Sequence, residues 1–199
     1  MSDEHLILTP QHDPPRTQPG RADAVKNREL LLETAKRLFD AQSVEAVTMS
    51  AIAEAAGVGK GTLYRHFENK VELCQALLDE DSRAFQARTL DHLRGPDGAY
   101  QHLRWFLRET LEFVERNSQL LCVGTGGTSS LEHPAHWWWR QTIRGLLGQI
   151  NPPGDLEYLA DVLYVMLDVH TVYFQRQVRG YDLERIASGM AGMIERLAT

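Results

Sequence analysis

The sequence predicts an all-α fold in which a small three-helix head, carrying a helix-turn-helix, precedes a larger helical body. Apolar residues recur at helical spacing from Val25 onward, and no segment alternates with a period of two for long enough to form a strand. The 199 residues, 43% of them hydrophobic, suffice for one large domain or two small ones. We expect a disordered arm at residues 1–20, the head at 21–70 and the body at 71–199.

The arm shows no helical period and contains four prolines, so it buries too little apolar surface to offset the entropy of ordering. Acidic residues stand where a secretion signal needs basic ones, and no apolar run in the chain reaches membrane-spanning length. Two cysteines, Cys74 and Cys122, are too few for a disulfide framework. We therefore expect a cytoplasmic protein that does not contact a membrane.

The head begins with a helix over residues 23–41, because Leu31, Ala35, Leu38 and Phe39 recur at helical spacing on one face. Polar residues occupy the opposite face. This helix is therefore expected to be amphipathic and to bury its apolar stripe.

Two short helices follow in the head. Thr48 is a suitable N-cap for a helix over residues 49–56, and Gly57 stands where a helix ends by turning left-handed. A second short helix is expected from residue 59 or 60 to residue 66, with Leu63 on its buried side. A short helix, a glycine turn and a second short helix form a helix-turn-helix.

The body is predicted to be helical throughout. Asn69 caps a long helix that ends before the Gly-Pro-Asp-Gly break at residues 95–98, and Glu72 completes a capping box with Asn69. Further helices are expected over residues 99–117, 135–150, 155–178 and 182–197, with a loop at residues 124–128.

The outward side of the second short helix is rich in hydrogen-bond donors that can reach phosphate oxygens or enter a major groove. These residues are Lys60, Thr62, Tyr64, Arg65 and His66. The whole chain carries a net charge of -6, whereas the head holds eight basic and seven acidic side chains. A nucleic-acid site is therefore expected to be a local cationic face on an otherwise acidic molecule.

The stretch TMSAIAEAAGVGKGTLYRHFENK, residues 48–70, resembles the amino-terminal domain of tetracycline-repressor-like (TetR family) transcription regulators. The match covers about residues 25–75 and includes the cap, the glycine turn and the start of the next helix. It departs from the family pattern at Ser43, Ala51 and Gly59, where a glycine, an acidic residue and a serine are common. For the body, the resemblance extends only to size and helical character.

The resemblance implies a role for each DNA-facing residue. Phosphate contacts are implied for Thr62, Tyr64, His66 and Lys70, the last at a helix start whose dipole favours anions. Base-edge contacts are implied for Lys60, Gly61 and Arg65, with Thr48 and Ser50 completing the set from the first short helix. Tyr64 could instead serve mainly in packing, and the two lysines could be ordinary solvated charges.

The last two predicted helices, over residues 155–178 and 182–197, are expected to form a twofold homodimer interface. The first is apolar nearly all round, so it must be buried on more than one side. The family resemblance points to the same place. A twofold dimer presents its two recognition helices to adjacent major grooves, so the expected partner is double-stranded DNA with a palindromic operator.

The body is also expected to bind a small apolar or aromatic effector, because it is rich in aromatic side chains. The candidate ligand-binding residues are Trp105, Phe106, Trp138, Tyr164, Met166, His170, Tyr173 and Phe174. The alternative is that these aromatic residues only form the core and that His170 is a core histidine. The expected function is a ligand-responsive repressor.

The sequence contains no pattern typical of catalysis, a cofactor or a metal. No nucleophile motif occurs, the glycine-rich loop lacks the ending of a phosphate-binding loop, and His133 and His136 are spaced loosely for a metal. We expect no enzyme activity, no cofactor and no metal site. Two rival hypotheses remain: a small-molecule binding or scavenging protein with a vestigial head, and an enzyme built on the helical body.

Overall fold

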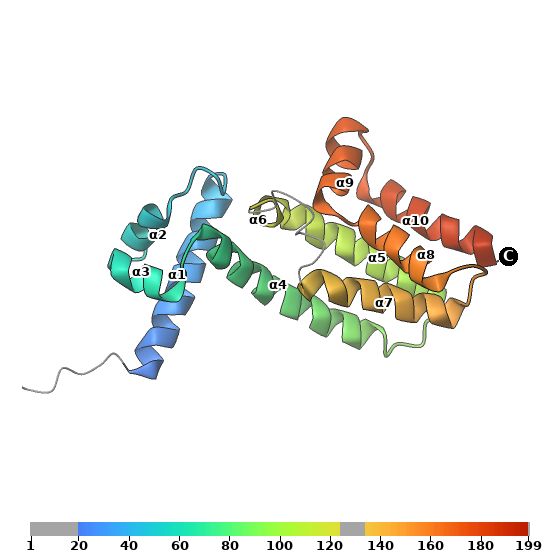
Figure 1. The fold of residues 1–199 in the computed structure, drawn as a ribbon, viewed down its shortest axis with the longest axis horizontal. Coiled ribbons are helices and arrows are strands. Elements are labelled where there is room, and N and C mark those ends of the chain that lie inside the picture. Colours follow the sequence, from blue (N-terminus) through green and yellow to red (C-terminus); the bar gives the residue numbers. More distant parts are fainter. Residues whose placement is uncertain (1–19, 124–133, 199) are drawn as a thin grey trace, which may run out of the picture.

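The computed structural model describes residues 20–123 and 134–198, and all regular elements in these ranges are helices (Figure 1). The head contains α1 (Arg21–Ala41), α2 (Met49–Ala55) and α3 (Lys60–His66). The body contains α4 (Lys70–His92), α5 (Ala99–Arg116), α6 (Ser118–Leu121), α7 (Pro134–Ile150), α8 (Leu156–Met166), α9 (Val169–Tyr173), the π-helical η2 (Phe174–Val178) and α10 (Leu183–Ala198). The all-α prediction is confirmed; the predicted arm, apart from Gly20, and the predicted loop lie outside the described residues.

The helix-turn-helix forms as predicted, from local signals. The Thr48 hydroxyl oxygen accepts a hydrogen bond from the Ala51 backbone N–H at 3.1 Å and so caps α2. Gly57 has a φ of +67°, in the left-handed region that side chains with a Cβ rarely adopt. The turn is closed by the Val58 N–H, which donates to the Ala53 carbonyl at 3.0 Å. These bonds hold α2 and α3 as one unit.

The head has a hydrophobic core of its own, which includes the first turns of α4. Its buried members are Leu31, Leu32, Ala35, Phe39, Val44, Val47, Ile52, Ala53, Leu63, Phe67, Leu73, Cys74, Ala76 and Leu77. Burial raises the pKa of the Cys74 thiol to about 11, so this side chain stays protonated at neutral pH. Because four of these core residues belong to α4, the N-terminal turns of that helix are packed into the head.

The start of α4 differs slightly from the predicted capping box. Asn69 caps the helix as expected, its side-chain oxygen accepting from the Glu72 N–H at 3.0 Å. The Glu72 carboxylate, however, accepts from the backbone N–H of Glu68 rather than from that of Asn69. From this cap, α4 runs from the head into the body (Figure 1).

The core of the body centres on α5, which packs against both α7 and α10. Phe85 stacks with both Phe106 and Phe113, with its ring centroid 5.7 Å and 5.6 Å from theirs. The edge of Trp139 packs against Phe113, and Trp139 is only 1% exposed. This aromatic stack joins α4, α5 and α7.

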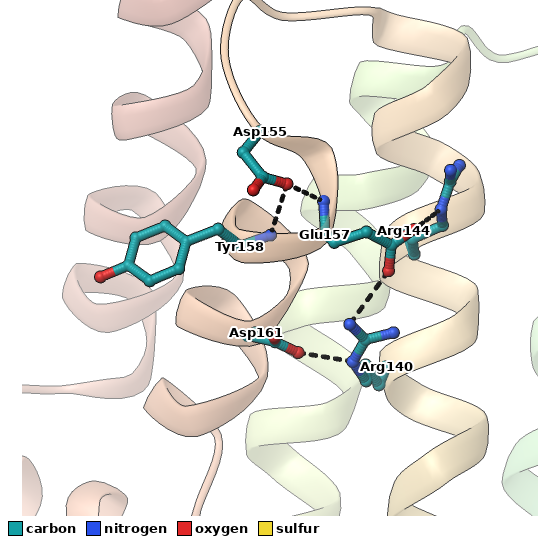
Figure 2. Close-up of polar contacts among 6 residues, drawn as sticks. All are labelled: Arg140, Arg144, Asp155, Glu157, Tyr158 and Asp161. Carbon is teal, nitrogen blue, oxygen red and sulfur yellow. Dashed lines mark hydrogen bonds and ion pairs between the residues drawn. The ribbon is translucent and has the colours of Figure 1, made fainter.

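A charged network fastens α8 to α7 at the surface (Figure 2). Arg140 on α7 bonds both Glu157, at 3.0 Å, and Asp161, and Arg144 bonds Glu157 at 2.7 Å. The hydrogen bond to Asp161 raises the pKa of Arg140, while the bonds from Arg144 and Arg140 lower the pKa of Glu157. The same segment begins with Asp155, which caps α8. We therefore assign this network a structural role, the attachment of α8 to α7.

The prediction of one continuous helix over residues 155–178 is wrong. The helix stops at Met166, and a new one begins because the Asp168 carboxylate accepts hydrogen bonds from the N–H groups of His170 and Thr171, at 3.0 and 3.2 Å. The last turns then widen into η2. The helix predicted over residues 99–117 also continues into an additional short helix, α6.

Asp168→Ala is expected to destabilise the protein by about 1 kcal/mol, because it removes the acceptor of both cap bonds. Chemical denaturation followed by circular dichroism measures the change. Asp168→Asn is the control, since its amide oxygen can still accept both bonds and stability should stay close to wild type. Equal stability of the alanine variant and the wild type would contradict a capping role.

Candidate nucleic-acid interface

The two sides of α3 differ sharply in burial. Leu63 is 0% exposed, and Phe67, the C-cap residue of α3, is 1% exposed. One side of the helix is therefore anchored in the head core. Tyr64 is 51% exposed, and Lys60 and Arg65 are also exposed on the other side. The helix is therefore held rigidly by its apolar side while it offers aromatic and cationic groups to a partner.

Hydrogen bonds within the head position several of these donors. The Arg65 guanidinium donates to the Thr62 hydroxyl at 2.9 Å, which holds both side chains together on α3. The Lys70 ammonium donates to the Glu45 backbone carbonyl at 3.2 Å, across a separation of 25 residues. An ammonium has three donors, so Lys70 keeps donors for a phosphate.

Thr48 and Ser50, at the start of α2, are candidates for contacts with the DNA. The Thr48 hydroxyl uses a lone pair in the cap, which leaves its own O–H available as a donor. Ser50 is half-buried in the first turn of α2, and His66 is half-buried at the end of α3 beside Phe67.

Neither packing nor backbone conformation in the head requires a glycine at position 61. It is exposed within α3, and a Cβ built there has no heavy atom within 4 Å. Its backbone is not in the left-handed region. A glycine that neither packing nor backbone conformation requires is suited to a surface that another molecule approaches closely.

Arg28 is a cation of this region that the sequence reasoning missed. Its guanidinium lies 5.4 Å from the centre of the Phe67 ring, so α1 places a positive charge beside the end of α3. Arg28 and Phe67 are 39 positions apart, and helical spacing contains no signal for such a contact.

The comparisons with known proteins agree with this geometry. A model of bacterial regulatory proteins of the tetR family matches residues 31–77, which include the whole helix-turn-helix. An HTH-type transcriptional regulator of Staphylococcus aureus strain USA300 is 36% identical over 166 residues, which cover 82% of this chain and 90% of the relative. This chain belongs to the TetR family. It is a DNA-binding transcriptional regulator, as the resemblance in the head predicts.

Solved structures of other proteins share the fold of most of this chain. FadR from Bacillus subtilis, in complex with stearoyl-CoA, aligns with a TM-score of 0.64 and 17% identity over 83% of this chain and 96% of FadR. AibR, in complex with isovaleryl coenzyme A and operator DNA, aligns with a TM-score of 0.58 and 24% identity over 84% of this chain and 97% of AibR. At these identities the likeness shows the fold of this TetR-family member.

The eight candidate effector residues of this TetR-family chain do not gather in one place. Phe106 and Trp138 meet in the core, with ring centroids 5.6 Å apart. Tyr164 is buried, and this burial raises its pKa to about 12. Met166 is half-buried against the same core. Trp105 is half-buried and lines a small cavity of about 260 Å³.

The other three candidates, His170, Tyr173 and Phe174, are exposed. They lie after the helix break at Asp168, which the spacing of apolar residues does not indicate. A larger groove, of about 780 Å³, lies between α1, α4, α5 and α6 and contains none of the eight residues. A ligand-binding role for the eight stays a prediction.

No helix among the described residues is both long and apolar enough to cross a membrane.

Proposed function

We propose that the chain is a homodimeric repressor that binds a palindromic operator through α3 of each head and releases it when a small molecule binds the body. The head, residues 21–70, is the DNA-binding domain, and residues 71–199 form the effector-binding and dimerisation domain. The protein works in the cytoplasm, by binding rather than by catalysis.

The observation that carries this proposal is the exposed polar side of α3 on a rigidly packed head. The phosphate contacts come from Thr62, Tyr64, His66 and Lys70, whose hydroxyl and nitrogen donors suit phosphate oxygens. Base edges are read by Lys60 and Arg65, with Gly61 allowing close approach. Thr48 and Ser50 add contacts from α2.

Exposed apolar side chains on α8, α9, η2 and α10 support the dimer, because a monomer rarely leaves so many on neighbouring elements. They are Tyr158 (65% exposed), Val165 (47%), Tyr173 (61%), Phe174 (50%), Val178 (66%) and Met193 (40%). A twofold axis through this surface makes the interface isologous and relates the two α3 helices by the same rotation.

The effector response rests on α4, which joins the head core to the body core. A ligand that shifts α4 changes the separation of the two α3 helices, and so the fit to adjacent major grooves. Structures of fold relatives that hold stearoyl-CoA or isovaleryl coenzyme A support a ligand-binding body. A compound that saturates the body without changing operator affinity would contradict this coupling.

Selection of bound sequences from a random DNA pool tests the DNA-binding proposal. We expect a palindromic consensus with half-sites one helical turn, or a multiple of it, apart. Analytical ultracentrifugation should detect a dimer. A monomeric protein, or a pool with no enriched sequence, would overturn the proposal. The two results together would favour a small-molecule binding or scavenging protein with a vestigial head.

Gly61→Ala is expected to weaken operator binding while leaving the free protein as stable as wild type or more so. Alanine is a better helix residue than glycine, by about 0.5–1 kcal/mol in a helix interior. A methyl group at a close contact with DNA should cost about 1–3 kcal/mol in binding, as overpacking does in a core. Fluorescence anisotropy with the selected operator measures the affinity.

The matched control for Gly61→Ala is Gly145→Ala on α7. Gly145 is also exposed and also has open space at its Cβ position, but it lies in the body. Both variants should melt at or above the wild-type temperature, and only Gly61→Ala should lose affinity. Unchanged affinity in Gly61→Ala would show that DNA does not approach α3 closely at this point.

A further inference from the structure

Two histidines and an aspartate meet where α4 ends and α5 begins. His92 is the last residue of α4, Asp97 lies in the connection, and His102 lies in the first turns of α5. One nitrogen of each imidazole and one oxygen of the carboxylate all lie within 4.8 Å of one another.

The two imidazoles are poorly satisfied as they stand. His92 Nε2 and His102 Nδ1 are buried, and neither has a hydrogen-bond partner among the residues that the structure describes. The His102 side chain belongs to a residue that is only 5% exposed. Buried polar atoms in native proteins are nearly always paired, so two such nitrogens in contacting rings indicate a missing ligand.

The positions of both rings are well defined. The His92 ring stacks on Trp105, with centroids 3.9 Å apart and planes 16° apart, and its centroid is 5.1 Å from that of His102. The backbone N–H of Gly95 donates to the His92 carbonyl at 3.0 Å, and that of His102 donates to Gly98 at 3.0 Å. The turn therefore holds both histidines together, and Asp97 lies beside them at an exposed position of the connection.

We propose that His92, Asp97 and His102 bind a divalent transition-metal ion of the zinc class. Imidazole nitrogen suits zinc, copper, nickel and cobalt, whereas magnesium and calcium prefer oxygen ligands alone. Three protein ligands leave a fourth position for water. Ligand atoms about 2.0–2.2 Å from a tetrahedral ion are roughly 3.3–3.6 Å apart, which is compatible with three atoms that all lie within 4.8 Å of one another.

This site does not include His133 and His136, whose spacing is loose for a metal. His133 and His136 are three positions apart in the chain, whereas His92, Asp97 and His102 are spaced by five positions across a helix break. An ion at this site would join the body end of α4 to α5. It would bind the folded chain better than the unfolded one and so stabilise it.

The test uses the full-length, untagged, metal-free protein titrated with Zn²⁺ by calorimetry and with Co²⁺ by visible absorption. We expect one ion per chain and the d–d bands of a nitrogen- and oxygen-ligated Co²⁺ ion. Asp97→Asn, at an exposed loop position, should fold normally by circular dichroism and bind at least about tenfold more weakly. Zn²⁺ should raise the Tm of the wild type but much less that of Asp97→Asn.

The matched control is the double variant His133→Gln and His136→Gln, which removes the other histidine pair and should bind as the wild type does. His92→Gln is a second ligand variant and should behave like Asp97→Asn. Equal Zn²⁺ affinity in the wild type and Asp97→Asn would overturn the proposal, as would the absence of binding at one ion per chain or loss of binding in the control.

Discussion

Phe67→Ala is expected to destabilise the head strongly while the body stays as stable as in the wild type. Phe67 is 1% exposed and closes α3 onto the head core, and truncating such a side chain costs about 3–5 kcal/mol. Loss of the Arg28 contact over its ring adds about 0.5–1 kcal/mol. The free energy of unfolding of a small domain is about 5–15 kcal/mol. Because the head core is small, the variant should lose most of the free energy that keeps the head folded.

The positions of the tryptophans allow the two parts to be measured separately. All four, Trp105 and Trp137–Trp139, lie in the body. Tryptophan emission therefore reports the body alone, whereas far-ultraviolet circular dichroism reports every helix. Phe67→Ala should lower the helical signal and the temperature of a first melting step, while the emission transition stays close to that of the wild type.

Tyr64→Ala is the control for Phe67→Ala, because it removes a large aromatic ring from the exposed side of the same helix. It should leave both transitions nearly unchanged and weaken only DNA binding. If the tryptophan transition of Phe67→Ala fell together with the helical signal, the two cores would be one cooperative unit, contrary to this prediction.

Operator affinity is expected to fall about a thousandfold between 50 and 200 mM salt. Each head brings three cations close to the duplex: Lys70 at a phosphate, and Lys60 and Arg65 in the major groove, where cations that contact base edges also displace counterions from the flanking phosphates. A dimer therefore brings six cations to the duplex. Each neutralised phosphate contributes about -0.9 to the slope of log affinity against log salt, which predicts a slope of about -5. Anisotropy titrations at four or five salt concentrations measure this slope.

Lys70→Gln should make the salt slope shallower by about two, since one cation is lost from each head. Arg83→Gln is the control: Arg83 is exposed on α4 and bonds its own helix at the Asp79 carbonyl, so the slope should not change. A wild-type slope near zero would show that these cations do not displace counterions from the duplex, and so do not bind it as proposed.

Much of the head could be predicted because its signals are local. The Thr48 cap, the Gly57 turn and the Asn69 cap each act within four residues, and the structure contains all three. In the body, the period of apolar residues located the helices but not the break at Asp168. A carboxylate that starts a new helix looks, in a periodic sequence, like a polar residue on a helix face.

The candidate sites divide in the same way. The outward face of α3 could be predicted, because a seven-residue helix with one buried side leaves little choice for the other. The eight body residues could not be grouped correctly, since aromatic side chains are equally suited to a core, a cavity and a subunit interface. Phe106 is buried in the core, whereas Phe174 is exposed on η2.

The sequence by itself determined the helical class, the helix-turn-helix and the residues that α3 presents, because caps, turns and helical periods depend on neighbours along the chain. Only the tertiary structure decided that Arg28 covers Phe67, that Tyr173 and Phe174 face outward, and that His92 meets His102 beside Trp105. These contacts depend on how helices pack and where a helix is interrupted, and residue spacing does not encode either.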